Sequence, residues 1–174
     1  MGRRRTERGA VLVEFALVMP LFVMLLLGTV TAGLAYNRKI DLTHATREGA
    51  RYGAAVSPFQ QWQSGTWASN VRNLVVDRSG GELTAADVCV ALVVSTSATT
   101  SSVYSGAGKP ASFFTTKSDG SACYADTYPQ FGTNDNGLRV QVLASRPTSI
   151  ELAILPSIAV TLNSRATAKS EAPA

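Results

Sequence analysis

The stretch RGAVLVEFALVMPLFVMLLLG, Arg8–Gly28, decides how this chain is organised, because it opens an apolar run long enough to cross a membrane. From Ala10 to Ala35 the only ionisable side chain is that of Glu14, over 26 residues. About 20 helical residues span the hydrocarbon core of a bilayer. We therefore expect a transmembrane helix over residues 10–36. Pro20 removes one backbone hydrogen bond of this helix and is expected to bend it.

Basic residues are concentrated in front of this run. Residues 1–9 carry four arginines and one glutamate, whereas the rest of the chain has 12 basic and 11 acidic side chains. The excess of arginine predicts a cytoplasmic N-terminus and an extracytoplasmic domain after the helix, although Arg38 and Lys39 weaken the contrast. The high pI is thus largely a property of residues 1–9, and no later basic patch interleaved with aromatic residues indicates nucleic-acid binding.

Three interpretations of the N-terminal segment compete. It can be an uncleaved anchor, or a secretory signal with Gly33 and Ala35 before the cut. The apolar part of secretory signals is usually shorter, and a charge within it is unusual. In the third interpretation a peptidase cuts between Gly9 and Ala10, and Glu14 becomes the fifth residue of the mature chain. A carboxylate deep in a bilayer costs roughly 2.5–3.5 kcal/mol on insertion scales, so Glu14 calls for a partner or a function.

The third interpretation coincides with a resemblance. A basic leader, Gly9, the small residue Ala10 and then Glu14 resemble the class III signals of type IV pilins, and more narrowly the start of TadE-like proteins. These are minor pilins or pseudopilins of tight-adherence, Flp-type pilus systems. The resemblance implies cleavage after Gly9 by a membrane prepilin peptidase. It also implies that Glu14 acts in assembly by meeting the terminal amine of a neighbouring subunit. Many type IV pilins have Phe directly after the cut, whereas this chain has Ala10.

The resemblance continues in LTHATREGARYGAAV, Leu42–Val56. On a helix, Ala45, Gly49 and Gly53 recur every four residues and form one stripe that lets another element approach closely. Each glycine costs about 1 kcal/mol relative to alanine, so the stripe favours a packing role over an ordinary solvated face. Glu48 can reach Arg51 three residues on as a helix charge pair. Residues 37–56 should therefore continue the helix outside the membrane to a length of roughly 70 Å.

Residues 57–174 predict an extracytoplasmic α+β domain of pilin-like layout, with a small, mostly antiparallel sheet. A short helix is expected over residues 66–79, capped by Thr66 and ended by Ser79–Gly81. Valine-rich runs at residues 87–94 and 138–145, and a third within 158–170, predict strands. The sequence leaves the connection between Pro147 and Pro156 undecided.

Residues 96–137 predict a long Ser/Thr-rich loop, because 14 of these 42 residues are Ser or Thr. Six of the chain's 13 aromatic residues also lie there, so part of the loop should pack or bind. Cys123 lies in the loop and Cys89 in the first strand. Outside the cytoplasm such a pair favours a disulfide over two free thiols.

No motif predicts catalysis, a cofactor or a metal. His44 is the only histidine, and together with two cysteines it does not supply the four ligands of a usual zinc site. We therefore expect His44 to be a solvent-exposed residue on the helix. DTYPQFGTNDNG, Asp126–Gly137, holds several oxygen ligands but lacks the EF-hand spacing, and ordinary turn chemistry explains it better. Phosphate-binding loops and nucleophile motifs are absent from the sequence. We therefore expect neither an enzyme nor a small-molecule site.

The sequence thus predicts a single-pass membrane protein that is a TadE-like minor pilin or pseudopilin. From the resemblance, its partners are the prepilin peptidase, the tight-adherence membrane platform and other pilins. A membrane-tethered or secreted adhesin is the alternative, and an envelope enzyme ranks third because the sequence offers it no site.

Overall fold

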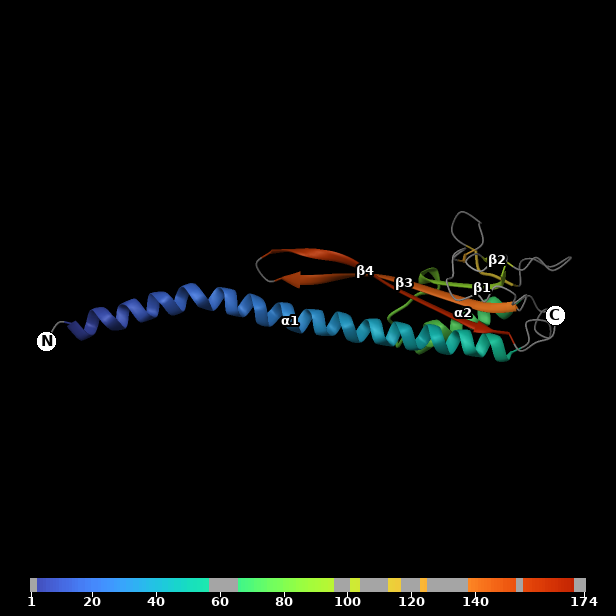
Figure 1. Cartoon of the computed structure of the whole chain (residues 1–174), viewed down its shortest axis with the longest axis horizontal. Helices are drawn as coiled ribbons and strands as arrows, with labels where there is room; N and C mark the ends of the chain where they lie inside the picture. Colours follow the sequence, from blue (N-terminus) through green and yellow to red (C-terminus); the bar gives the residue numbers. More distant parts are fainter. Residues whose placement is uncertain are drawn as a thin grey trace. The chain divides into compact units, whose positions relative to one another are not determined.

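A computed structural model describes residues 3–56, 66–95, 101–103, 113–116, 123–124, 138–152 and 155–170 (Figure 1). The fold is α+β, as predicted. Along the chain the elements are the helices α1 (Arg3–Ala55) and α2 (Trp67–Arg78), the 3₁₀ turn η2 (Ala85–Asp87), and the strands β1 (Val88–Ser95), β2 (Ser101–Val103), β3 (Leu138–Leu152) and β4 (Leu155–Lys169).

Helix α1 is continuous from Arg3 to Ala55 and passes through Pro20. Its N-terminal part is rich in Leu and Ala, which favour helix. The hydroxyl of Thr29 donates to the carbonyl of Leu26, and that of Thr43 to the carbonyl of Lys39, so these polar side chains are satisfied within the helix itself. The helix begins at Arg3, seven residues before the start of the expected transmembrane helix at residue 10.

Contacts divide the chain into two compact units. The first unit comprises Met1–Asn37 with Pro147–Thr161, and the second comprises Arg38–Arg146 with Leu162–Ala174. In the first unit the large apolar side chains of α1 from Val11 to Leu34 are exposed. The second unit holds the hydrophobic core, which is described below.

The four strands form one sheet in the order β2-β1-β3-β4. β1 pairs antiparallel with β2, with Val93 opposite Val103, and antiparallel with β3, with Val90 opposite Val142. Where the structure describes the connection that the sequence left undecided, it is strand: β3 continues beyond Pro147 to Leu152, and β4 begins at Leu155. The pairing of β3 with β1 ends at Ala144. Proline has no backbone N–H to donate, and at Pro147 no residue of β1 requires this donor.

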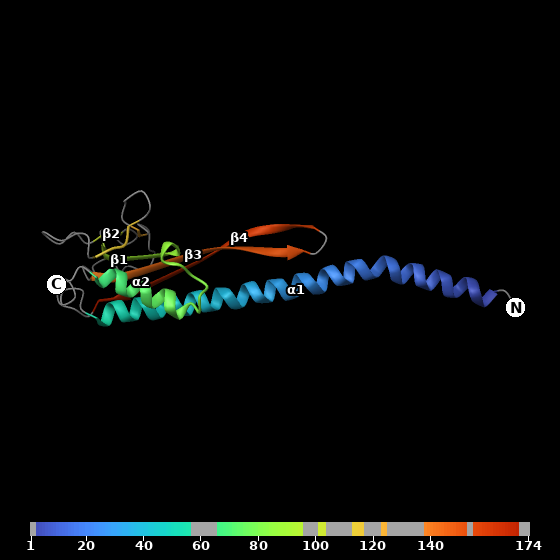
Figure 2. The ribbon, with the colours of Figure 1, turned by 180° about the vertical axis from the view of Figure 1, so that it is seen from behind.

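The core of the second unit is built where α1, α2 and the sheet meet. Trp67, Val71 and Val75 of α2 are fully buried, and so are Val90 and Leu92 of β1 and Val140 and Val142 of β3. The views in Figures 1 and 2 both show α2 beside the C-terminal turns of α1.

Helix α2 matches the expected helix over 66–79 to within one residue at each end. Thr66 is the residue before its first turn, but its side chain makes no capping hydrogen bond, which corrects the predicted cap. Gly80 and Gly81 after the helix have φ of +65° and +85°, a backbone conformation that side chains with a Cβ rarely adopt. These two glycines therefore end the helix, as predicted.

Part of the long loop packs against the sheet. Phe113 is buried in the core, and its carbonyl accepts a hydrogen bond from the N–H of Leu92. Phe114 bridges to Ala91, and Tyr124 packs against the small cluster of Ala91 and Val93. The other aromatic residues of the loop lie outside the described residues.

Candidate functional site

The predicted processing site lies near the start of α1. Gly9 and Ala10 are both helical and exposed, and a Cβ added at Gly9 would meet nothing within 4 Å. No packing therefore requires a glycine at this position. Because glycine is about 1 kcal/mol less favourable than alanine in a helix, Gly9 is the residue of the first turns at which the backbone unwinds most cheaply.

Glu14 lies four residues after Ala10 on an exposed face of the same helix. Its neighbours Val13 and Phe15 are 62% and 59% exposed, so the carboxylate stands among apolar side chains. Within the described part of the chain no ion pair or hydrogen bond involves Glu14. The only described helix long and apolar enough to cross a membrane, Gly9–Ala55, contains this residue. A carboxylate in such a segment needs an external partner to offset its burial.

The small-residue stripe forms the other part of the candidate site. Ala45, Gly49 and Gly53 are buried, and so are the neighbouring Thr46 and Ala50. This face of α1 therefore belongs to the interior of the second unit.

The two glycines are the points of closest approach. A Cβ at Gly49 would overlap a γ-methyl of Val75 in α2. A Cβ at Gly53 would lie 2.9 Å from a γ-methyl of Val140 in β3 and 3.1 Å from one of Val71 in α2. The glycines thus bring the backbone of α1 against both the second helix and the sheet. Their contacts are within this chain.

Two polar contacts fix the same face of α1, and sequence reasoning did not find them. The hydroxyls of Thr46 and Ser164 of β4 lie 2.8 Å apart, and Thr46 also donates to the carbonyl of Thr43 at 3.1 Å. The indole N–H of Trp67 donates to the carbonyl of Gly53 at 3.3 Å. The two residues of each pair are distant in sequence, so these hydrogen bonds can be found only when the tertiary structure is known.

The predicted charge pair is corrected by the structure. The carboxylate of Glu48 lies 3.2 Å from the guanidinium of Arg78 in α2, and no ion pair joins it to Arg51. Glu48 and Arg51 share one helix, but α2 presents a second arginine to the same carboxylate. The pair connects two elements, with side chains 49% and 58% exposed.

Cys89 of β1 and Cys123 of the long loop form a disulfide, the pairing that the sequence favoured, with their Cα atoms 5.2 Å apart. Cys123 is buried, and its N–H donates to the carbonyl of Thr115. The hydroxyl of Thr115 in turn accepts from the N–H of Val90. The disulfide thus ties one point of the loop to the edge of the core.

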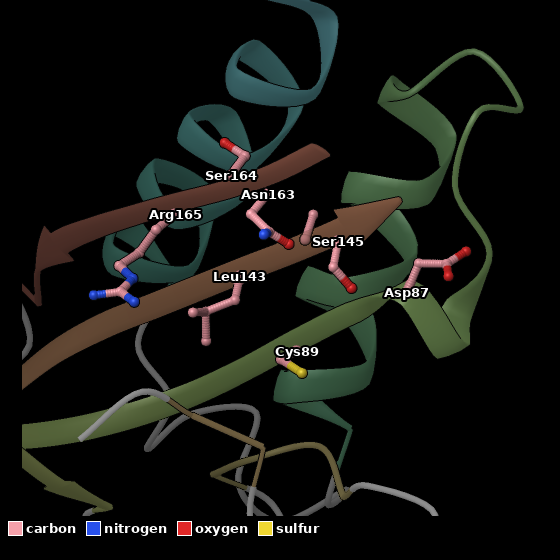
Figure 3. A pocket seen from close by; sticks show the side chains of 8 residues that line it. Asp87, Cys89, Leu143, Ser145, Asn163, Ser164 and Arg165 are labelled. Carbon is pink, nitrogen blue, oxygen red and sulfur yellow. The ribbon is translucent and has the colours of Figure 1, made fainter. Parts of the chain in front are cut away.

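A cavity of about 320 Å³ lies beside Cys89 (Figure 3). Polar side chains of η2, β3 and β4 surround it, among them Asp87, Ser145, Asn163 and Arg165. The carboxylate of Asp87 already accepts from the N–H and hydroxyl of Thr84. No group of three or more potential metal ligands occurs among the described residues, and the predicted turn of Asp126–Gly137 lies outside them.

His44 is exposed on α1, and sequence reasoning placed it there as a solvated residue. It lines a broad groove together with Arg47 and Arg51 of α1 and Arg78 of α2. Leu74 of α2 and Ala168 and Lys169 of β4 also line it, so no pattern within α1 alone indicated the groove.

The N-terminal segment of the chain is similar to a known protein family. Residues 9–51 match the family model of TadE-like proteins. The matched segment begins at the candidate processing glycine and includes Glu14 and Gly49. This match confirms the resemblance that the sequence predicted. Neither the curated proteins nor the solved structures yield a match to this chain.

Proposed function

We propose that this chain, with its TadE-like N-terminal segment, is a minor pilin or pseudopilin of a tight-adherence pilus. The single observation that supports this most directly is the family match over residues 9–51. One apolar helix in that region has the length and composition of a membrane span. The family match by itself indicates an association with pilus machinery. The proposal adds two steps, which are cleavage after Gly9 and pairing of Glu14 with a neighbouring subunit.

In the first proposed step a prepilin peptidase hydrolyses the peptide bond between Gly9 and Ala10. The products are the basic leader, which ends in the Gly9 carboxylate, and a mature chain with a free amine on Ala10. This amine is cationic near neutral pH. The cut thus removes the arginines of the leader and creates one positive charge four residues from Glu14 in sequence.

In the second step Glu14 of one subunit pairs with the Ala10 amine of its neighbour as the helix leaves the membrane. The exposed and unpaired position of Glu14 supports this role. Pairing offsets the burial cost of roughly 2.5–3.5 kcal/mol that an isolated carboxylate would carry. It also fixes the axial register of adjacent helices, because a shift along the helix would leave both charges unpaired. Glu14 is therefore an assembly residue in this proposal.

The processing step is tested by the intact mass and N-terminal residue of the protein from its native membranes. We expect a chain that begins at Ala10. The Gly9→Val variant should keep its leader, whereas Gly33→Val, the same change at an exposed glycine of the same helix, should be processed normally. A native chain that begins at Tyr36, or one that keeps the leader, would contradict the proposal.

The assembly step is tested by Glu14→Gln, which removes the charge and keeps the shape. We expect this variant to be processed and inserted but to be lost from assembled pili or from the assembly complex. Phe15→Leu is the matched control, because it changes the adjacent exposed residue without changing charge. Normal assembly of Glu14→Gln would refute the pairing mechanism. It would instead favour a membrane-tethered adhesin, which a plain anchor would serve equally well.

A further inference from the structure

A groove of about 930 Å³ lies between α1, α2 and the end of β4 within the second unit. Its walls carry Arg47 and Arg51 of α1, Arg78 of α2 and Lys169 of β4, against one acidic residue, Glu48. The role proposed for the N-terminal segment uses none of these side chains. The groove is therefore a cationic surface that still lacks a function.

The charge of the groove is only partly satisfied within the chain. Arg78 is held by Glu48 at 3.2 Å. Arg47 and Arg51 are exposed, and neither has an ion-pair or hydrogen-bond partner among the residues that the structure describes. Because they are four residues apart on one helix, their side chains project from the same face, with about 5–6 Å between Cβ atoms.

Apolar residues also line the groove. Ala54, Leu74 of α2 and Ala168 of β4 are among them; Ala54 is buried, and the other two are half-buried. Tyr52, a residue that is 37% exposed, also lines the groove. Apolar side chains thus line the groove together with its arginines. A bare polyanion has no apolar surface to bury against these side chains. A helix with one apolar and one acidic face would bury its apolar face in the groove and pair its acidic face with the arginines.

We propose that this groove binds an acidic amphipathic helix of a partner protein. A helix with carboxylates at i and i+4 presents the same spacing as Arg47 and Arg51, and an arginine fork suits a carboxylate well. The apolar face of that helix covers Tyr52 and Leu74. The inference does not depend on removal of the leader or on filament formation, because every residue that it uses lies between Arg47 and Lys169.

The test uses the full chain in detergent micelles and a fluorescent designed peptide of about 18 residues, long enough to form a helix alone. One face of the peptide carries leucine and alanine, and the other carries glutamates at i and i+4. A second peptide has every glutamate replaced by glutamine. Binding is measured by fluorescence anisotropy at low and at physiological salt.

We expect the glutamate peptide to bind more tightly than the glutamine peptide, and salt to weaken its binding. Arg51→Glu should weaken it about fivefold or more, since an exposed ion pair is replaced by a repulsion. Arg165→Glu makes the same change of charge at an exposed position outside the groove, and it should leave binding unchanged. Arg47→Glu provides a second groove variant, and circular dichroism checks that each variant is folded.

Three results would overturn the proposal. The first is equal binding of the two peptides, or no binding of either. The second is an equal loss of binding in Arg51→Glu and Arg165→Glu, which would show that only net charge matters. The third is tighter binding of inorganic polyphosphate than of the peptide, which would assign the groove to polyanions.

Discussion

Replacing Gly49 by alanine should destabilise the second unit, although the same replacement stabilises an ordinary helix. In an exposed helix Gly→Ala gains about 1 kcal/mol. At Gly49 the new Cβ would overlap a γ-methyl of Val75, a residue with no exposed surface. A β-branched side chain in a helix has one strongly preferred rotamer, so Val75 has little freedom to turn away. Val142 lies 3.9 Å from the new atom and limits the space further.

Inserting a methyl group into such a core costs typically about 1–3 kcal/mol. The overlap therefore outweighs the gain in helix propensity, and we expect a net loss of about 1 kcal/mol. Each kcal/mol corresponds to roughly 2–8 °C in the unfolding midpoint for domains of this size range. The measurement is thermal unfolding of the full chain in detergent, followed by near-ultraviolet circular dichroism, which reports tertiary packing.

Two further variants make this result specific. Gly33→Ala is the matched control, because nothing lies within 4 Å of a Cβ at Gly33, and its midpoint should be unchanged or higher. In a Gly49→Ala/Val75→Ala double variant the overlapping methyl is absent, so the two changes should be less harmful together than their separate effects predict. A midpoint for Gly49→Ala equal to or above that of the wild type would refute the close-packing argument.

Three other changes probe the same unit. Thr46→Val keeps the shape but leaves the Ser164 hydroxyl without its partner, so it should cost about 1 kcal/mol in the free energy of unfolding by urea. Cys89→Ala/Cys123→Ala opens a loop with a sequence separation of 34 and should cost roughly 3–4 kcal/mol in the chain-entropy model, with dithiothreitol lowering the wild-type stability but not that of the variant. Glu48→Gln removes an ion pair of half-exposed side chains, so its unfolding midpoint should stay within the error of the measurement.

The sequence by itself determined the features that depend on local pattern. Short windows of the sequence were enough to recognise the apolar run with Glu14, the basic residues before Gly9, and the glycines Gly80 and Gly81 after α2. Membrane insertion, helix propensity and turn conformation depend on neighbouring residues and on the solvent. For that reason the long helix, the helix over 66–79 and the class of the fold could be predicted without knowledge of the packing.

Strand limits were predicted only in part. Valine content indicated the cores of β1 and β3, but the sequence left undecided the segment after Pro147 into which β3 extends. Pro147 lies within this extension. It is tolerated because β1 ends its register at Ala144 and requires no donor beyond that point. The position of a neighbouring strand is a property of the whole sheet and cannot be read from the residues of one strand.

Tertiary structure alone decided how polar and charged groups are partnered. The sequence offered Glu48 a partner on its own helix, Arg51, but the approach of α2 brought Arg78 within 3.2 Å of it. The pairing of Thr46 with Ser164 spans 118 residues of sequence. Such contacts form because the glycine stripe lets the elements approach closely, and that approach then determines which distant side chains meet. Local sequence fixes the elements through short-range sterics and solvation, whereas partners are set by the geometry of packing over the whole unit.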